Sequence, residues 1–183
     1  MSSVLIILAE GFEELEAVTV IDVLRRAEIT VVTAGLNDGP ITSARQIKIT
    51  PDKTINEIEA DKFDMLVLPG GQPGTDNLAK DDRVKKIVQT MHQNNKYTAA
   101  ICAAPYVLSQ AGILNNKTAT SYPSFHDKLN AKSVDTKSAV VIDGNVVTSQ
   151  GPGTALEFAF KLVEIFKGSG KAKEIAAAML YNK

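Results

Sequence analysis

The sequence has very little cysteine, histidine or tryptophan. Among its 183 residues there is one cysteine, Cys102, with two histidines and no tryptophan. A single cysteine forms no disulfide within the chain, and it excludes a metal site built from several cysteines. Such sparing use of cysteine is typical of a reducing compartment, so we expect a cytoplasmic protein.

Net charge and long apolar runs are also lacking. Twenty basic residues against 21 acidic residues give a net charge of -1, which argues against nucleic acid or a membrane surface as a partner. No apolar run approaches the roughly 18 residues that span a bilayer. The run at 4–9 has no basic flank and is stopped by Glu10, so it predicts a buried strand rather than a signal sequence.

What remains is a composition suited to a folded core. Hydrophobic residues make up 44% of the chain and charged residues 22%, which is typical of a globular domain. A length of 183 residues suits one domain spanning 1–183.

Short apolar runs alternate with amphipathic stretches along the chain. Strands are expected at 4–9, 29–33, 64–68, 98–101, 139–142 and 146–148. Helices are expected at 13–27, 82–94, 103–111 and on both sides of the glycine-rich break at 168–170. This alternation predicts a doubly wound α/β fold, with a mostly parallel sheet and helices on both faces.

Local signals add detail to this pattern. Thr54 with Glu57, and Thr154 with Glu157, have the spacing of capping boxes that begin helices. The alternating residues 45–49 follow a turn signal and suggest a small edge hairpin.

Cys102 falls between a predicted strand and a predicted helix. In doubly wound sheets, sites form where loops leave the carboxyl ends of the strands, and the loops 10–16, 69–74 and 101–105 qualify. A helix N-terminus lowers the pKa of a thiol from about 8.5, and a sharp strand-to-helix turn exposes a nucleophile. The alternative is that Cys102 is one more small residue in an alanine-rich buried segment, because free cysteine is often buried.

The other two loops carry glycines and acids. Gly70 and Gly71 permit close backbone approach and can aim N–H groups at an oxyanion, although a tight turn also uses glycine. They match neither a phosphate loop nor a dinucleotide-binding turn. Loop 10–16 holds four glutamates, most of which are expected to be solvated.

A carboxyl group beside Cys102 has a definite effect that depends on its protonation. If ionised, it raises the pKa of the thiol, whereas if protonated it donates a hydrogen bond to the thiolate. A useful partner is therefore a glutamic acid with an elevated pKa, which can also move protons during a reaction.

Five segments together resemble a known family. They are AEGFEELE (9–16), DVLRRA (22–27), LVLPGG (66–71), AAICAAP (99–105) and TSQGPGT (148–154). In register over nearly the whole chain, they are similar to the ThiJ/PfpI superfamily of class I glutamine amidotransferase-like domains. The resemblance is strongest to its DJ-1 branch, which contains parkinsonism-associated glyoxalase, deglycase and redox-sensing proteins. It implies a flavodoxin-like three-layer sandwich that forms a homodimer.

The resemblance also implies roles for particular residues. It makes Cys102 an oxidation-sensitive nucleophile and Glu16 a protonated acid in contact with its sulfur. The N–H groups of Gly71 and Ala103, beside Gly70, would form the oxyanion and substrate site. The implied substrates are small aldehydes or glycated thiols and amines.

This sequence departs from the family pattern at two places. Tyr122 precedes Pro123 where close relatives commonly have a histidine; tyrosine can hydrogen-bond substrate or sulfur but does not titrate near neutral pH. His126, about one helical turn later, either swings toward the site or is an ordinary exposed histidine on a short helix. Alanines at 103 and 104, where some relatives place histidine, argue against a Cys–His dyad.

Three functions remain open at this point. The leading hypothesis is conversion of methylglyoxal to lactate, or repair of early glycation adducts, through a hemithioacetal on Cys102, with no metal or organic cofactor. The alternative is a sensor whose cysteine is oxidised to a sulfinate without essential turnover. The third is a protein-handling partner without chemistry of its own. For the implied dimer, the candidate contributors are Val18, Val20 and the pair Arg25 and Arg26, since one amphipathic helix does not distinguish core from partner.

Overall fold

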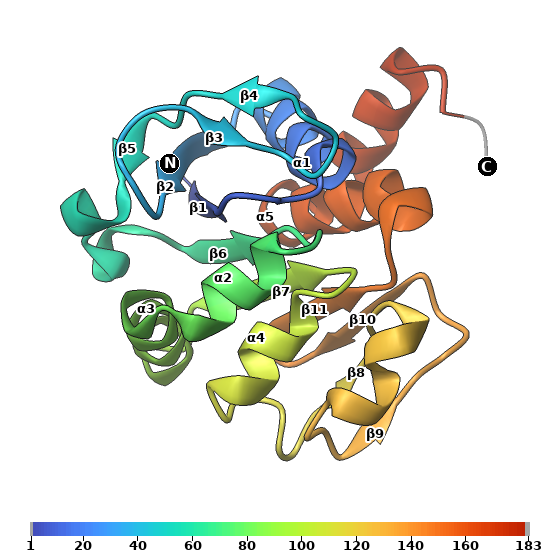
Figure 1. Cartoon of the computed structure of the whole chain (residues 1–183). Helices are drawn as coiled ribbons and strands as arrows, with labels where there is room; N and C mark the ends of the chain where they lie inside the picture. Colours follow the sequence, from blue (N-terminus) through green and yellow to red (C-terminus); the bar gives the residue numbers. More distant parts are fainter. Residues whose placement is uncertain (1, 182–183) are drawn as a thin grey trace.

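A seven-stranded sheet forms the centre of the protein (Figure 1). The computed structural model describes residues 2–181. The spatial order of the strands is β10 (Val140–Asp143), β11 (Val146–Ser149), β7 (Tyr97–Ile101), β6 (Met65–Leu68), β1 (Ser3–Leu8), β2 (Thr30–Gly35) and β5 (Lys53–Thr54). Neighbouring strands are parallel except β10 and β11, which form an antiparallel hairpin. The predicted doubly wound, mostly parallel sheet is therefore confirmed.

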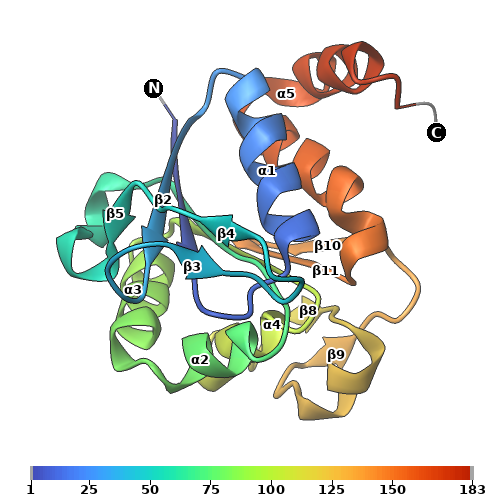
Figure 2. The same cartoon turned by 45° about the horizontal axis from the view of Figure 1, so that its top comes forward.

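Helices cover both faces of this sheet, giving three layers (Figures 1 and 2). One face is covered by α1 (Glu14–Arg26) and α5 (Ala155–Ala178). The other face is covered by α2 (Gly74–Lys80), α3 (Asp82–Gln93) and α4 (Pro105–Gln110). The sequence pattern missed α2, because this short helix begins with glycine and buries only Gly74, Thr75 and Leu78. Within residues 2–181, no helix is both long and apolar enough to cross a membrane.

The first strand shows why its sequence is apolar throughout. Alternate side chains point to opposite faces of a strand. Val4, Ile6 and Leu8 accordingly pack in the core beneath α1 and α5. Leu5 and Ile7 pack in the second core, beneath α2 to α4. A strand buried on both faces has no polar positions, which is the run that the sequence shows.

Short strands and 3-10 turns complete the fold. They are β3 (Ile41–Thr42) paired with β4 (Lys48–Ile49), β8 (Thr118–Ala119) paired with β9 (Ser133–Val134), and the 3-10 turns η1 (Ile55–Glu57), η2 (Ala60–Lys62), η3 (Pro123–Lys128) and η4 (Pro152–Thr154). The pair β3–β4 confirms the small hairpin. In α5, Gly168 interrupts the helix with φ 81° and ψ 165°, at the predicted glycine-rich break.

The two capping boxes have different outcomes. At η1, the N–H and hydroxyl of Thr54 both donate to the Glu57 carboxylate, at 2.7 and 2.9 Å. The second prediction is wrong, because the Thr154 hydroxyl makes no capping bond to α5. It instead accepts from the Gly151 N–H at 3.1 Å and bonds the Ser149 hydroxyl at 2.7 Å, holding the loop before the helix.

The outer surface of α1 differs from the expectation in one respect. Val18 is 47% exposed, whereas Val20 is 1% exposed and packs in the core. Val20 is therefore unavailable as a partner contact, while Val18 remains a surface residue. The homodimer itself stays a prediction.

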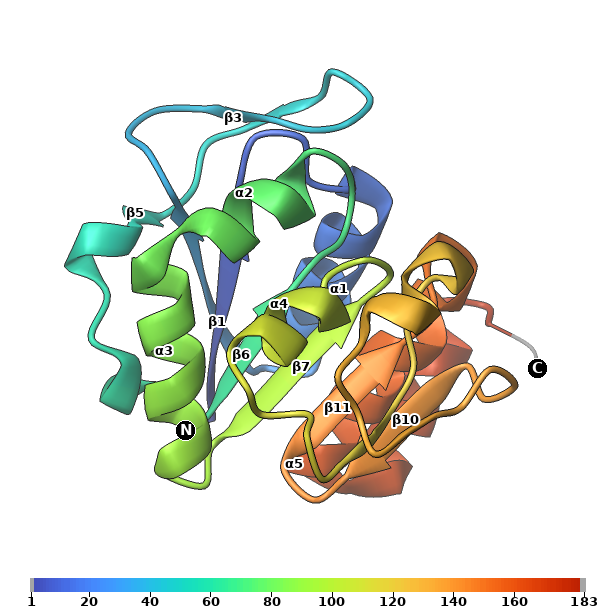
Figure 3. The same cartoon turned by 60° about the horizontal axis from the view of Figure 1, so that its bottom comes forward.

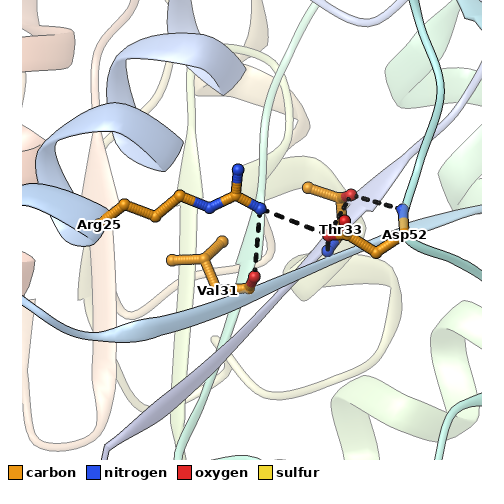
Figure 4. Close-up of polar contacts among 4 residues, drawn as sticks. All are labelled: Arg25, Val31, Thr33 and Asp52. Atoms are coloured by element: carbon orange, nitrogen blue, oxygen red, sulfur yellow. Dashed lines mark hydrogen bonds and ion pairs between the residues drawn. The ribbon is translucent and has the colours of Figure 1, made fainter.

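Arg25 ties the end of α1 to the chain beyond it (Figure 4). Its guanidinium donates to the Val31 carbonyl at 3.3 Å and lies 3.4 Å from the Asp52 carboxylate. That carboxylate also accepts from the N–H and hydroxyl of Thr33, at 2.9 and 2.8 Å. Partial burial opposes ionisation of Asp52, but the Thr33 hydrogen bonds and the Arg25 charge outweigh it and lower the pKa of Asp52.

We expect Asp52→Ala to lower the free energy of unfolding by about 1–2 kcal/mol at pH 7, because it leaves the buried Thr33 N–H without its acceptor. A lowered carboxyl pKa stabilises the fold above its ordinary value and loses that effect as the pH falls. The difference between wild type and variant should therefore shrink below about pH 4. Urea unfolding at several pH values measures it.

The matched control is Asp22→Ala, which removes an exposed ion pair with Arg26 at 2.8 Å. Its cost should stay within about 0.5 kcal/mol. Equal losses in the two variants would contradict a special role for the Asp52 contacts.

Candidate active site

Three loops meet at the carboxyl edge of the sheet. They follow β1, β6 and β7, the last leading toward α4 (Figure 3). The loop after β1 is bonded to the loop after β6: Glu13 N–H donates to the Gly70 carbonyl at 2.8 Å, and Gly74 N–H donates to the Gly11 carbonyl at 3.2 Å. The structure thus brings together the loops that the sequence marked at 10–16, 69–74 and 101–105.

Two glycines allow this close approach. A Cβ atom on Gly70 would lie 2.6 Å from Cys102 Cβ, closer than real side chains permit, and 3.0 Å from Glu16 Oε2, which is a tight contact. Gly71 has φ 93°, in the left-handed region that favours glycine. The Gly-Gly pair is thus needed for both the backbone conformation and the packing of the loop.

Cys102 occupies a sharp backbone turn. Its φ of 64° is uncommon for a residue with a side chain. Two backbone hydrogen bonds hold it: Cys102 N–H donates to the Ser149 carbonyl at 3.0 Å, and the Cys102 carbonyl accepts from Tyr122 N–H at 2.7 Å. Its side chain is partly exposed. The helix α4 begins at Pro105, so the expected start at 103 is wrong and a turn separates the cysteine from the helix.

Glu16 places a buried carboxyl group against the cysteine. The residue lies in the first turn of α1 and is 0% exposed. Its Oε2 accepts the Gly70 N–H at 2.8 Å, while the buried Oε1 lacks a fixed partner in the described chain. Burial raises the pKa of Glu16 to about 7, although the bonds from Gly70 N–H and the Cys102 thiol act in the opposite direction. An acid poised near neutral pH suits proton transfer.

The pKa of the Cys102 thiol differs from the expectation. Burial, then the charge of Glu16 and the hydrogen bond to it, raise the pKa of Cys102 to about 12. The N–H groups of Ala103 and Gly71 act in the opposite direction but do not outweigh these effects. The expected lowering of the thiol pKa is thus wrong, because burial of the sulfur and the neighbouring Glu16 carboxylate outweigh the N–H groups around it. The proton of this pair therefore rests on the sulfur when Glu16 is ionised.

The remaining predicted residues lie at different places around the sulfur. The N–H groups of Gly71 and Ala103 point at it, whereas the Gly70 N–H is taken by Glu16. The Tyr122 side chain is half exposed beside the turn. His126 on η3 is half-buried rather than exposed, and its Nε2 donates to the Ser121 carbonyl at 3.0 Å. Among residues 2–181, it forms no hydrogen bond with the cysteine.

The sequence analysis assigned no site residue to the loop after β11, although segment 148–154 carries part of the family resemblance. Its Ser149 carbonyl holds the cysteine N–H, and Gly151 lies against the Tyr122 ring. The Gly-Pro-Gly run at 151–153 was the available signal for a tight loop at this edge. In the described part of the chain, no three His, Cys, Asp or Glu side chains gather in a way that could hold a metal ion.

Comparison with known proteins places this chain among close relatives. The DJ-1/PfpI family model matches residues 2–165. Protein dj-1beta of Drosophila melanogaster is 44% identical over 181 residues, covering 97% of this chain and 96% of that protein. The crystal structure of Drosophila melanogaster DJ-1beta has a TM-score of 0.95 at 42% identity, with all of both chains covered.

Two further relatives have informative names. The glutathione-independent glyoxalase DJR-1.2 of Caenorhabditis elegans is 34% identical over 177 residues, covering 95% of this chain and 93% of that protein. An oxidized form of Toxoplasma gondii DJ-1 has a TM-score of 0.95 at 36% identity, with 100% of both chains covered.

We expect Glu16→Gln to speed alkylation of Cys102 by iodoacetamide at pH 8 by about tenfold or more, since the neutral amide removes the charge that raises the thiol pKa and each pKa unit is tenfold in thiolate. The measurement is the alkylation rate from pH 5 to pH 10, followed by intact mass. Glu13→Gln is the control and should change the rate less than twofold. Slower alkylation in Glu16→Gln would show instead that a protonated Glu16 stabilises the thiolate.

Proposed function

This chain belongs to the DJ-1/PfpI family, and from that premise we propose that it is a cofactor-independent glyoxalase that converts small 2-oxoaldehydes such as methylglyoxal to hydroxy acids. The observation that carries the proposal is the contact between Cys102 and a buried Glu16 whose pKa is raised to about 7. A family relative, the Caenorhabditis elegans protein, is named a glutathione-independent glyoxalase. The same nucleophile would serve for early glycation adducts, which also carry an electrophilic carbon.

In the first step, the ionised Glu16 removes the proton from the Cys102 thiol while the sulfur adds to the aldehyde carbon. A thiol with a raised pKa needs such a base, and Glu16 is in contact with it. A C–S bond forms and the carbonyl electron pair moves onto oxygen. The Gly71 and Ala103 N–H groups, which point at the sulfur, are placed to stabilise this oxyanion. Return of the proton from Glu16 gives a neutral hemithioacetal.

The second step moves a proton between neighbouring carbons. Glu16 takes the hydrogen from the former aldehyde carbon, giving an enediol, and a proton returns to the adjacent carbon to give a thioester. One carbon is oxidised and its neighbour reduced, so no external oxidant is needed. Water then hydrolyses the thioester, releasing lactate and restoring the thiol. The unpartnered Oε1 of Glu16 is free to carry this proton.

The protein should convert methylglyoxal to lactate, measured by NMR with no glutathione present. Cys102→Ser should abolish turnover, and Glu16→Gln should lower kcat by about 100-fold or more, because it removes the proton carrier. Glu13→Gln removes a neighbouring acid whose charge is the smallest of the causes that shift the pKa of Glu16, so it should keep kcat within about threefold. Lactate formation at the wild-type rate by Cys102→Ser would refute the proposal.

A second candidate function is oxidation sensing, which the oxidized Toxoplasma gondii relative favours. One peroxide converts the thiol to a sulfenic acid and water, and a second gives the sulfinic acid and another water. The same N–H groups and Glu16 would hydrogen-bond the new oxygens.

Mild peroxide should then add two oxygens at Cys102 and no more, as read by intact mass and peptide mapping. Glu16→Ala should let oxidation continue to the sulfonic acid, because it removes a hydrogen-bond partner of the sulfinate. Absence of any oxygen gain in wild type would count against the sensor.

A further inference from the structure

Two segments of the chain are hydrogen-bonded to the backbone of Cys102. Tyr122 N–H donates to the Cys102 carbonyl at 2.7 Å. Cys102 N–H donates to the carbonyl of Ser149, two residues before Gly151, at 3.0 Å. The positions of residues 122 and 151 are therefore fixed relative to the nucleophile.

The Tyr122 ring bridges these two segments. A Cβ atom placed on Gly151 would lie 3.3 Å from Tyr122 Cδ2 and 3.8 Å from Cε2; apart from its chain neighbours, no other residue of 2–181 would lie within 4 Å. Gly151 has φ 165°, an extended conformation open to any residue. The absence of a side chain at 151 thus leaves the space that the ring fills.

The backbone of Gly151, which is the seat of the Tyr122 ring, is itself held by hydrogen bonds. Gly151 N–H donates to the Thr154 hydroxyl at 3.1 Å, and that hydroxyl lies 2.9 Å from the Gly151 carbonyl. Thr154 N–H also donates to this carbonyl at 2.9 Å. The Tyr122 ring rests on the fixed backbone of Gly151, and its own backbone is bonded to Cys102. Its position is therefore restricted at both ends.

The ring of Tyr122, rather than its hydroxyl, makes the contact with Gly151. The side chain is 47% exposed, so one part covers Gly151 and the rest faces solvent beside the turn. Within residues 2–181, its hydroxyl has no hydrogen-bond partner. The ring is therefore a partly exposed aromatic surface on a backbone that is hydrogen-bonded to the Cys102 turn, and we call this ring the aromatic wall.

We propose that Tyr122 determines substrate size: its ring, seated on Gly151, admits small aliphatic aldehydes to Cys102 and excludes aldehydes with a bulky group on the carbonyl. Steric exclusion by a fixed side chain acts on the larger substrate and leaves the smaller one unaffected. The part of this inference that concerns aldehydes rests on the proposed glyoxalase function. The part that concerns access of other reagents to the Cys102 sulfur does not.

The first experiment compares kcat/KM for methylglyoxal and phenylglyoxal in wild type, Tyr122→Ala and Tyr122→Phe. The Ala variant should raise the phenylglyoxal to methylglyoxal ratio at least fivefold, because the wall is removed. The Phe variant keeps the ring and should stay within twofold of wild type. An unchanged ratio in Tyr122→Ala, or a Phe variant that matches the Ala variant, would overturn the proposal.

A second readout is independent of turnover. The rate of Cys102 modification by N-(1-pyrenyl)maleimide relative to iodoacetamide should also rise at least fivefold in Tyr122→Ala and not in Tyr122→Phe. If wild type converts neither aldehyde, the proposed function fails while this ratio still tests the wall. An unchanged ratio here overturns the wall whatever the outcome with aldehydes.

Gly151→Ala tests the seat of the ring, because its methyl group would meet only Tyr122. Alone it should change the maleimide to iodoacetamide ratio at least twofold, since the ring must shift. In the Tyr122→Ala background the same substitution should have no effect. An unchanged ratio in the single variant, or an equal effect in both backgrounds, would contradict seating of the ring on Gly151.

Discussion

The burial of the Glu16 carboxyl group between the Gly70 N–H and the Cys102 thiol is the constraint on which the site depends. It requires the first turn of α1, the loop after β6 and the turn after β7 to meet at one point. A Cβ on Gly70 would touch both the cysteine and the acid, so glycine is needed there. The parallel register makes the meeting possible, because Leu68 of β6 pairs with Ala100 of β7 and their loops leave the sheet side by side.

This arrangement costs stability, and the cost depends on pH. An acid whose pKa rises from 4.5 to about 7 on folding favours the native state at low pH and loses that effect as the pH rises between these values. The difference amounts to about 3 kcal/mol above pH 7. Burial likewise raises the pKa of the Cys102 thiol, and the neighbouring Glu16 carboxylate raises it further. A site that keeps a buried acid and a thiol in contact is poised for proton transfer rather than for stability.

The sequence predicted the structure correctly where a hydrophobic pattern or a glycine pair has a single physical explanation. A strand buried on both faces must be apolar throughout, so β1 was predicted, and the loops at 10–16, 69–74 and 101–105 followed from the ends of parallel strands. The helix α2 escaped because it has too few apolar residues for a period to show. The pKa of Cys102 was misjudged because it depends on which group faces the sulfur, and pairing Glu16 with it came from family resemblance. Thr154 has the spacing of a cap, but local hydrogen bonds with Gly151 and Ser149, in the loop before the helix, take its hydroxyl.

The loops around the cysteine differ in how much room they leave for a side chain. On the side of Glu16, a Cβ on Gly71 or Gly74 would run into the backbone of residues 11–13, so these loops leave no room for change. In the loop after β11, a Cβ on Gly151 would meet, apart from its chain neighbours and among residues 2–181, only the Tyr122 ring. The acid and the oxyanion donors therefore belong to the rigid part of the fold, whereas the residue at 122 can change size without disturbing them. Within this architecture, the chemistry of the site and its substrate range are set by different segments of the chain.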